Sequence, residues 1–289
     1  MARTTRSISA CSGSQCGDER PETLDHRGSR GSAHRRRVDL GAVLGGTPMP
    51  ARWNAYIAAV ASRDPAPDTF TGFGPAVTDW FVALASDDSR AFWRATRDVW
   101  QRDIRSPLEA LLGELAAEVG GRVKLFRPYR DMRYASADAG PIKPQAGGLV
   151  RTAESASARY VEVSIEGFYA GRGMYRFERD QLERYRAAAL EARSGERLEG
   201  LLVRAAADAL EVGGDALKTV PRGVARDHPR AALLRRKGLF LGATLPPGAA
   251  LETSAPRDHA RRVWAAADEA IAWLDAHVGP SELPRPGRR

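Results

Sequence analysis

Apolar side chains recur every three or four positions over much of the chain, the spacing that places them on one face of a helix. Between residues 75 and 119 this spacing predicts three helices, with Asp87-Asp88-Ser89 between the first two and Pro107 opening the third. Further helices are predicted at 177–193, ended by Gly195, and at 198–210 and 257–277.

A period of two residues marks the clearest strand. Tyr160–Glu166 alternates apolar and polar side chains, and Gly167 turns it back into Phe168–Ala170 as a hairpin. Short apolar runs predict strands at 123–126 and 239–241, whereas glycine and proline predict irregular backbone over 140–148. Because helices and strands do not alternate regularly, we predict an α+β single domain: a small, mainly antiparallel sheet packed against several helices.

The ends of the chain lack both periods. Residues 1–48 are rich in Ser, Gly and Arg, a composition that predicts a disordered leader. Met49, directly after it, is a candidate translation start. Residues 49–69 predict a short helix and a proline-containing linker, 70–278 the globular domain, and 279–289 a disordered tail.

Net charge, apolar runs and cysteine positions indicate which classes of partner the chain suits. The formal net charge is +8, which suits an anionic small molecule and permits nucleic acid. No apolar run approaches the roughly 20 residues that span a bilayer, and no secretory signal is visible, so we expect a cytoplasmic protein without membrane contact. Cys11 and Cys16 lie in the leader without zinc-finger spacing, so no metal site is predicted. No motif indicates a cofactor or an oligomeric state.

The densest polar chemistry lies at residues 127–134. Arg127, Arg130 and Arg133 place three guanidiniums within seven positions, and guanidiniums bind phosphate or carboxylate through paired hydrogen bonds. Asp131 can orient one of them or act as a base. The alternative is an internal ion-pair network, which uses the same residue types.

A second polar stretch runs from Lys218 through Arg222 to Asp227-His228-Pro229. His228 is a candidate general base; alternatively, Asp227 caps a short helix and His228 packs nearby. All four lysines of the chain fall within 124–237, close to these stretches. We expect one cleft to be lined by Arg130, Arg133, Lys143, Lys218, Arg222 and His228.

The first stretch reads Arg127-x-x-Arg130-Asp131-x-Arg133-Tyr134, followed by Asp138 and Lys143. With this motif the chain resembles domain of unknown function 2461, a bacterial and fungal family, over about residues 70–278. Two positions depart from the family pattern: Ala139 replaces its lysine and Ile142 its tyrosine. The resemblance implies no assigned activity. Further residues that carry it are Phe70, Gly72, Phe73, Arg90, Trp93, Gly171, Gly173, Met174, Tyr175, Leu217, Lys218, Pro221, Gly223, Asp227, His228, Pro229, Leu234 and Lys237.

Three functions remain open at this point. The first is binding of a phosphate- or carboxylate-bearing ligand by a cluster of cations: Arg127, Arg130, Arg133, Lys143, Lys218, Arg222 and Lys237. The second is an enzyme, a hydrolase or transferase, with Asp131 or His228 as base. The third is a nucleic-acid or protein interaction module in which the arginine motif is an internal scaffold.

Overall fold

The computed structural model describes residues 69–133 and 139–284. The predicted leader with both cysteines, the candidate start at Met49 and the helix and linker predicted over 49–69, apart from Thr69, lie outside these residues. So do Tyr134 and Asp138 of the motif and the last five residues of the predicted tail.

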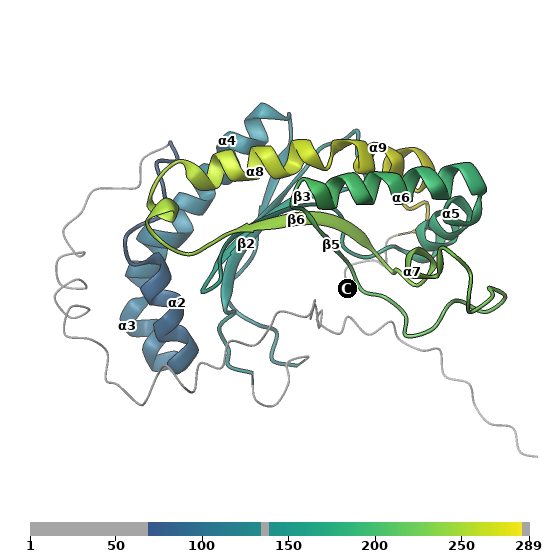
Figure 1. The fold of residues 1–289 in the computed structure, drawn as a ribbon. Helices are drawn as coiled ribbons and strands as arrows, with labels where there is room; N and C mark the ends of the chain where they lie inside the picture. The colour runs from purple at the N-terminus through teal and green to yellow at the C-terminus, as the bar shows by residue number, and fades with distance from the viewer. Residues whose placement is uncertain (1–68, 134–138, 285–289) are drawn as a thin grey trace, which may run out of the picture.

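The centre of the fold is one six-stranded antiparallel sheet with strand order β1-β2-β3-β4-β6-β5 (Figure 1). The first four strands pair in chain order, each antiparallel to the next. After the helices α5 and α6, the chain returns to the sheet and β6 pairs with β4. The strands are β1 (Arg122–Leu125), β2 (Gln145–Arg151), β3 (Ala158–Ser164), β4 (Gly167–Met174), β5 (Glu211–Gly213) and β6 (Leu239–Leu245).

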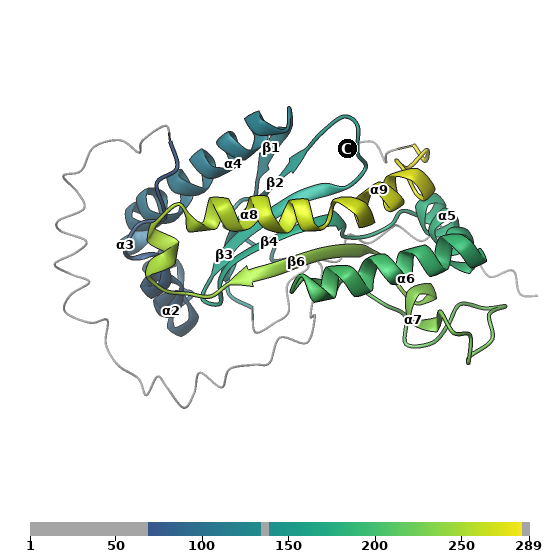
Figure 2. The same cartoon turned by 45° about the horizontal axis from the view of Figure 1, so that its top comes forward.

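The helices that pack on the sheet lie on one of its faces. In Figure 2, α8 and α9 run across the sheet, with α4 on one side and α6 on the other. The helices are α2 (Val77–Ser86), α3 (Arg90–Trp100), α4 (Ser106–Glu118), α5 (Arg179–Leu190), α6 (Ala192–Ala207), α7 (Ala231–Leu234), α8 (Ala255–Ala266) and α9 (Asp268–His277), with a short 3-10 helix at Ala249–Glu252. None of these described helices is long and apolar enough to cross a membrane.

Strand alternation explains where the core lies. Val161 and Val163 of β3, with Phe168 and Ala170 of β4, point toward the helices and are fully buried. The predicted α+β domain with a mainly antiparallel sheet is therefore confirmed.

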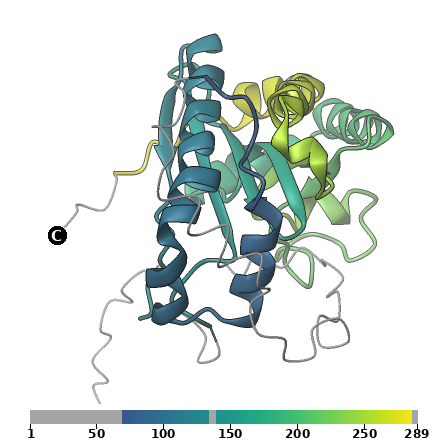
Figure 3. The ribbon, with the colours of Figure 1, turned by 90° about the vertical axis from the view of Figure 1, so that its left-hand side faces the viewer.

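The boundaries of several helices differ from the prediction. The helix predicted to end at Gly195 ends at Leu190, because Glu191 is extended and its carboxylate accepts the N–H groups of Arg193 and Ser194, which starts α6. The long helix predicted over 257–277 is α8 and α9, with Ala267 between them. A π-helical turn, Gln101–Arg105, joins α3 directly to α4, and Figure 3 shows these two helices following each other along one side of the sheet.

The glycine-rich segments were also mispredicted. Residues 145–148, predicted to be irregular, begin strand β2, which runs to Arg151. The strand predicted at Phe168–Ala170 is longer than expected, because β4 continues through Gly171 and Gly173 to Met174. Glycine is a weak strand former, but here neighbouring groups occupy the space of the missing side chain. A methyl group on Gly148 would come within 2.5 Å of Leu112 of α4, so close helix packing needs a glycine there.

Candidate functional site

The arginine motif sits on a hairpin that extends the β1–β2 pair. Beyond the strands, the N–H of Lys143 donates to the carbonyl of Pro128 (2.7 Å), and the N–H of Arg130 donates to that of Pro141 (2.9 Å). Tyr129 and Ile142 form a β-bridge between these bonds, and Ile142 is only 3% exposed. Ile142, at the position where the resemblance implies a tyrosine, is thus a core residue here. These contacts hold the hairpin arms together.

Three cations gather along this hairpin: Arg127, Arg130 and Lys143, which we call the basic corner. Burial lowers the pKa of Lys143, and the positive charges of Arg127 and Arg130 lower it further. The guanidinium of Arg130 donates to the carbonyl of Gly140 (3.2 Å). Across residues 69–133 and 139–284, none of the three forms an ion pair with a carboxylate. Within the described residues, no carboxylate lies within ion-pair distance of the basic corner, although the Asp88 carboxylate lies against Gly140, whose carbonyl accepts the bond from Arg130.

Asp131 belongs to a different contact. Its carboxylate accepts two bonds from the guanidinium of Arg133, at 2.9 and 2.6 Å, and the backbone N–H of Arg133 lies 3.2 Å from it. The hydrogen bond from the Arg133 side chain is the main cause that lowers the pKa of Asp131 to about 2. Both side chains are exposed. A carboxylate held in this way is a weak proton acceptor at neutral pH.

The second predicted segment lies between β5 and β6. Lys218 and Arg222 are exposed, and Lys237 is half-buried just before β6. The expected cap by Asp227 is wrong, because α7 has no side-chain cap. Instead Nδ1 of His228 accepts the backbone N–H of Arg230 (3.0 Å), which fixes the turn before the helix.

The sheet order separates the two segments. β1 and β5 are opposite edge strands, five strand spacings or roughly 24 Å apart. The arginine motif follows the end of β1, whereas the loop after β5 leaves the other end of the sheet, since β5 runs antiparallel to β6. In Figure 1 both segments lie on the side of the sheet away from α8, at opposite ends. The structure therefore brings Arg127, Arg130 and Lys143 together but does not bring them to Lys218, Arg222 or His228 in one cleft.

Sequence reasoning missed the residues that lie beside the basic corner. The face of the sheet turned away from α8, which none of the described helices covers and which we call the helix-free face, carries Tyr160 and Glu162 of β3 and Tyr169 of β4. The hydroxyl of Tyr160 donates to the carboxylate of Glu162 at 2.5 Å, and Glu162 is only 6% exposed. The alternation of β3 placed Glu162 opposite the valines, but only the strand register shows that its neighbours are two tyrosines.

A row of aromatic rings connects the basic corner to this face. Nζ of Lys143 lies 5.8 Å from the ring centroid of Phe126. The Phe126 and Tyr160 centroids are 6.0 Å apart, and those of Tyr160 and Tyr169 are 6.2 Å apart. We call Phe126, Tyr160 and Tyr169 the aromatic floor.

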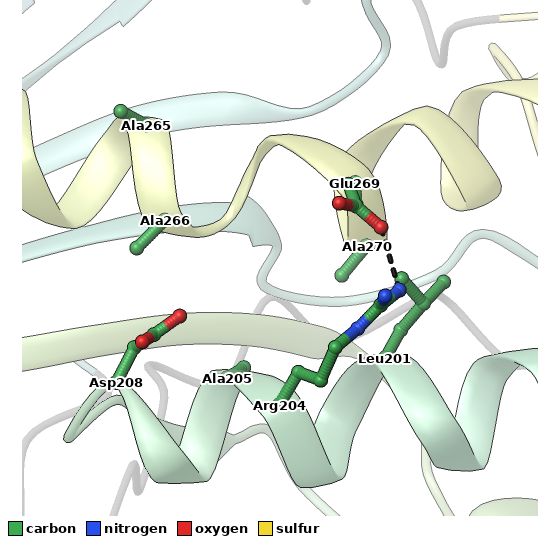
Figure 4. A pocket seen from close by; sticks show the side chains of 8 residues that line it. All are labelled: Leu201, Arg204, Ala205, Asp208, Ala265, Ala266, Glu269 and Ala270. Atoms are coloured by element: carbon green, nitrogen blue, oxygen red, sulfur yellow. Dashed lines mark hydrogen bonds and ion pairs between the residues drawn. The ribbon is translucent and has the colours of Figure 1, made fainter.

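The opposite face of the molecule carries a cavity of about 190 Å³ between α6 and the α8–α9 pair (Figure 4). Four alanines and Leu201 line it together with three charged residues, Arg204, Asp208 and Glu269. Arg204 and Glu269 form an ion pair of 2.6 Å. None of the predicted site residues lines it. Within the described parts of the chain, no group of three His, Cys, Asp or Glu side chains is placed to hold a metal ion.

Fold and contacts together define an α+β protein with a basic corner that forms no ion pair within the described residues and lies beside an aromatic sheet face. The chain belongs to the family described as conserved hypothetical protein (DUF2461), which it matches over residues 76–273. The family resemblance expected from the arginine motif is thereby confirmed. No curated protein and no solved structure matches the chain. The family description names no substrate or reaction.

Proposed function

We propose that this protein binds a phosphate- or carboxylate-bearing ligand at the basic corner. The observation that carries the proposal is the grouping of Arg127, Arg130 and Lys143 without an ion-pair partner in the described residues. Burial lowers the pKa of Lys143, and the charges of Arg127 and Arg130 lower it further. Like charges held together cost free energy, and a bound anion removes that cost.

The chemistry of the three groups suits an oxyanion. A guanidinium offers paired donors to phosphate or carboxylate, while an ammonium contributes a compact charge. Arg130 is oriented through its bond to the Gly140 carbonyl, and the hairpin fixes the backbone on which it and Lys143 stand. Less reorganisation is then needed when the anion binds.

The test compares ligand-induced stabilisation of the wild type with that of Lys143→Gln and Arg130→Gln. Thermal shifts are measured with inorganic phosphate and citrate against sodium chloride of equal ionic strength. A ligand at 100 times its Kd stabilises the native state by about 2.7 kcal/mol, so we expect a rise in Tm that both variants reduce. Arg179→Gln, at an arginine of α5 that is 87% exposed, is the matched control. Equal shifts in all four proteins, or none in the wild type, would rule out an anion site at the basic corner.

The enzymatic alternative has less support. Asp131 is paired with Arg133 and its pKa is held at about 2, chiefly by that hydrogen bond. Nδ1 of His228 already accepts a backbone N–H. Neither group is therefore set up as a general base at neutral pH. The interaction-module alternative can be separated by the effect of salt on affinity. The affinity for a polynucleotide bound along the protein would fall steeply as the salt concentration rises.

A further inference from the structure

We propose that residues 214–237, which we call the basic loop, bind single-stranded nucleic acid together with the ring of Tyr175. The basic loop connects β5 to β6 and lies at the opposite end of the sheet from the basic corner (Figure 1). This binding is a second function of the protein, and it does not depend on the anion site proposed above.

The first feature of the basic loop is its charge. Seven of its 24 residues are lysine or arginine and two are aspartate, so this segment carries +5 of the chain's formal net charge of +8. None of the seven cations forms an ion pair with the described residues, whereas Arg179 and Arg184 of the neighbouring α5 each pair with a carboxylate of their own helix. Lys218, Arg222 and Arg226 are exposed. Surface cations at this density attract polyanions.

The basic loop is anchored by its own backbone. At its neck, the N–H of Leu217 donates to the carbonyl of Arg235 at 2.7 Å. Further along, Leu233 is buried, and its carbonyl accepts the hydroxyl of Tyr185 in α5 (3.2 Å). The cations therefore stand on a loop whose shape is already fixed, which lowers the conformational cost of binding a partner.

An exposed aromatic ring stands at the foot of the basic loop. The ring of Tyr175 stacks on that of Phe240, with centroids 5.8 Å apart and an angle of 18° between the planes, and Tyr175 is 50% exposed. Phe240 lies over Gly213, where a methyl group would overlap its ring, and the guanidinium of Arg236 donates to the Gly213 carbonyl (3.1 Å). The Tyr175 ring is thus supported on one side by Phe240, and its exposed part can stack on a base beside the cations of the loop.

Single-stranded nucleic acid fits both features. Its phosphates suit the arginines, which are five of the seven cations and form paired hydrogen bonds with phosphate. Its unpaired bases can stack on an aromatic side chain, whereas the bases of a duplex are already stacked on each other. An acidic polypeptide would match the charge alone. A membrane surface would need an apolar side chain to insert, and within residues 214–237, all of them described, no large apolar side chain is exposed.

The experiment measures the fluorescence anisotropy of labelled oligonucleotides of about 20 residues, as single-stranded DNA, single-stranded RNA and duplex DNA, titrated with the full chain. We expect a single strand to bind about tenfold more tightly than the duplex, because stacking of a base on a tyrosine contributes on this scale. If the three exposed cations each contact a phosphate, the affinity of the single strand should fall about 20-fold between about 50 and 200 mM sodium chloride.

Two kinds of variant separate the cations from the ring. The double variant Arg222→Gln with Arg226→Gln removes two exposed charges, so it should weaken binding and reduce the effect of salt to about threefold over the same range. Tyr175→Leu should weaken the single strand about tenfold without changing the effect of salt, and Tyr175→Phe should keep the wild-type affinity. Arg179→Gln, at a side chain 87% exposed, is the matched control, and thermal melts show that each variant folds.

Other outcomes overturn the inference in distinct ways. Failure of every oligonucleotide to bind at low salt removes it entirely. Wild-type affinity and salt dependence in the double variant would mean that the nucleic acid binds elsewhere on the chain. A duplex that binds as tightly as the single strand, with no effect of Tyr175→Leu, would exclude recognition of unpaired bases. Equal displacement of the oligonucleotide by polyglutamate of the same charge would replace nucleic acid with an acidic polypeptide.

Discussion

The two faces of the sheet use the same strands for opposite purposes. Phe168 and Tyr169 are neighbours in β4. Phe168 is fully buried beneath α8, and its ring centroid lies 6.2 Å from that of His259. Tyr169 instead lies half-buried over glycines on the helix-free face. Since side chains alternate along a strand, one position separates core from candidate site.

Charges show the same contrast. On the helix-covered face the guanidinium of Arg172 contacts Asp268 and the carbonyl of Trp264, and His259 lies between the Ala243 carbonyl (2.9 Å) and Arg262 (2.9 Å). The charge of Arg172 and both ring nitrogens of His259 thus have partners there, although Nε of Arg172 and Nε1 of Trp264 donate no hydrogen bond among the described residues. The basic corner, beside the other face, forms no ion pair within the described residues. Local rules that fail in one place and hold elsewhere point to function at the place where they fail.

The largest difference should come from shortening neighbouring rings. Phe168→Ala removes a fully buried side chain and should lower the free energy of unfolding by about 3–5 kcal/mol. Tyr169→Ala, one position along, should cost clearly less because its ring is only half-buried. Urea denaturation of both variants measures the difference. Equal losses would mean that the helix-free face is as much a core as the other.

A smaller and asymmetric effect is expected at the Arg172–Asp268 pair. Arg172 is 8% exposed, whereas the Asp268 side chain is 61% exposed. Asp268→Asn leaves a buried guanidinium without this partner and should cost about 3 kcal/mol. Arg172→Met leaves a solvated carboxylate and fills a similar volume, so its cost should stay below about 1 kcal/mol. The two urea midpoints decide, and the reverse order would contradict the assignment of burial.

The contrast between the faces also explains what the sequence could predict. The spacing of apolar residues identifies elements with a strong pattern, such as β3 with its alternation and α4 with its leucines. The order of these elements along the chain then predicts the fold class. The arginine motif stood out because charge at that density is unusual. The aromatic floor did not, because Tyr160 and Tyr169 become neighbours only through the β3–β4 register, and their glycine supports lie on other strands. The two basic segments could not be placed either, since their separation depends on strand order.

Acid should weaken the helix-covered face through His259. Burial, with a further contribution from the charge of Arg262, lowers the pKa of His259 below its usual 6.5, although its bond to the Ala243 carbonyl opposes this. The unfolded chain therefore binds more protons than the native state as pH falls through this range, so stability decreases. We expect urea midpoints to drop between pH 7.5 and 5.5, and His259→Gln to reduce the drop. Asp131 does not contribute in this window, because its pKa is about 2, mainly through the Arg133 hydrogen bond. An unchanged slope in the variant would place the pH dependence elsewhere.

The smallest effect has the opposite sign and belongs to the basic corner. In the protein without ligand, Lys143→Gln removes one of three mutually repelling charges, so it should raise the free energy of unfolding by about 0.5 kcal/mol. Added sodium chloride should shrink this gain, because it screens the repulsion between the remaining cations and Lys143 in the wild type. Phosphate should reverse it, since only the wild type then has the full cluster neutralised. Urea melts in low salt, high salt and phosphate give all three comparisons. A loss above about 1 kcal/mol in low salt would show that the ammonium stabilises the hairpin, and the basic corner would then be part of the scaffold, as the helix-covered face is.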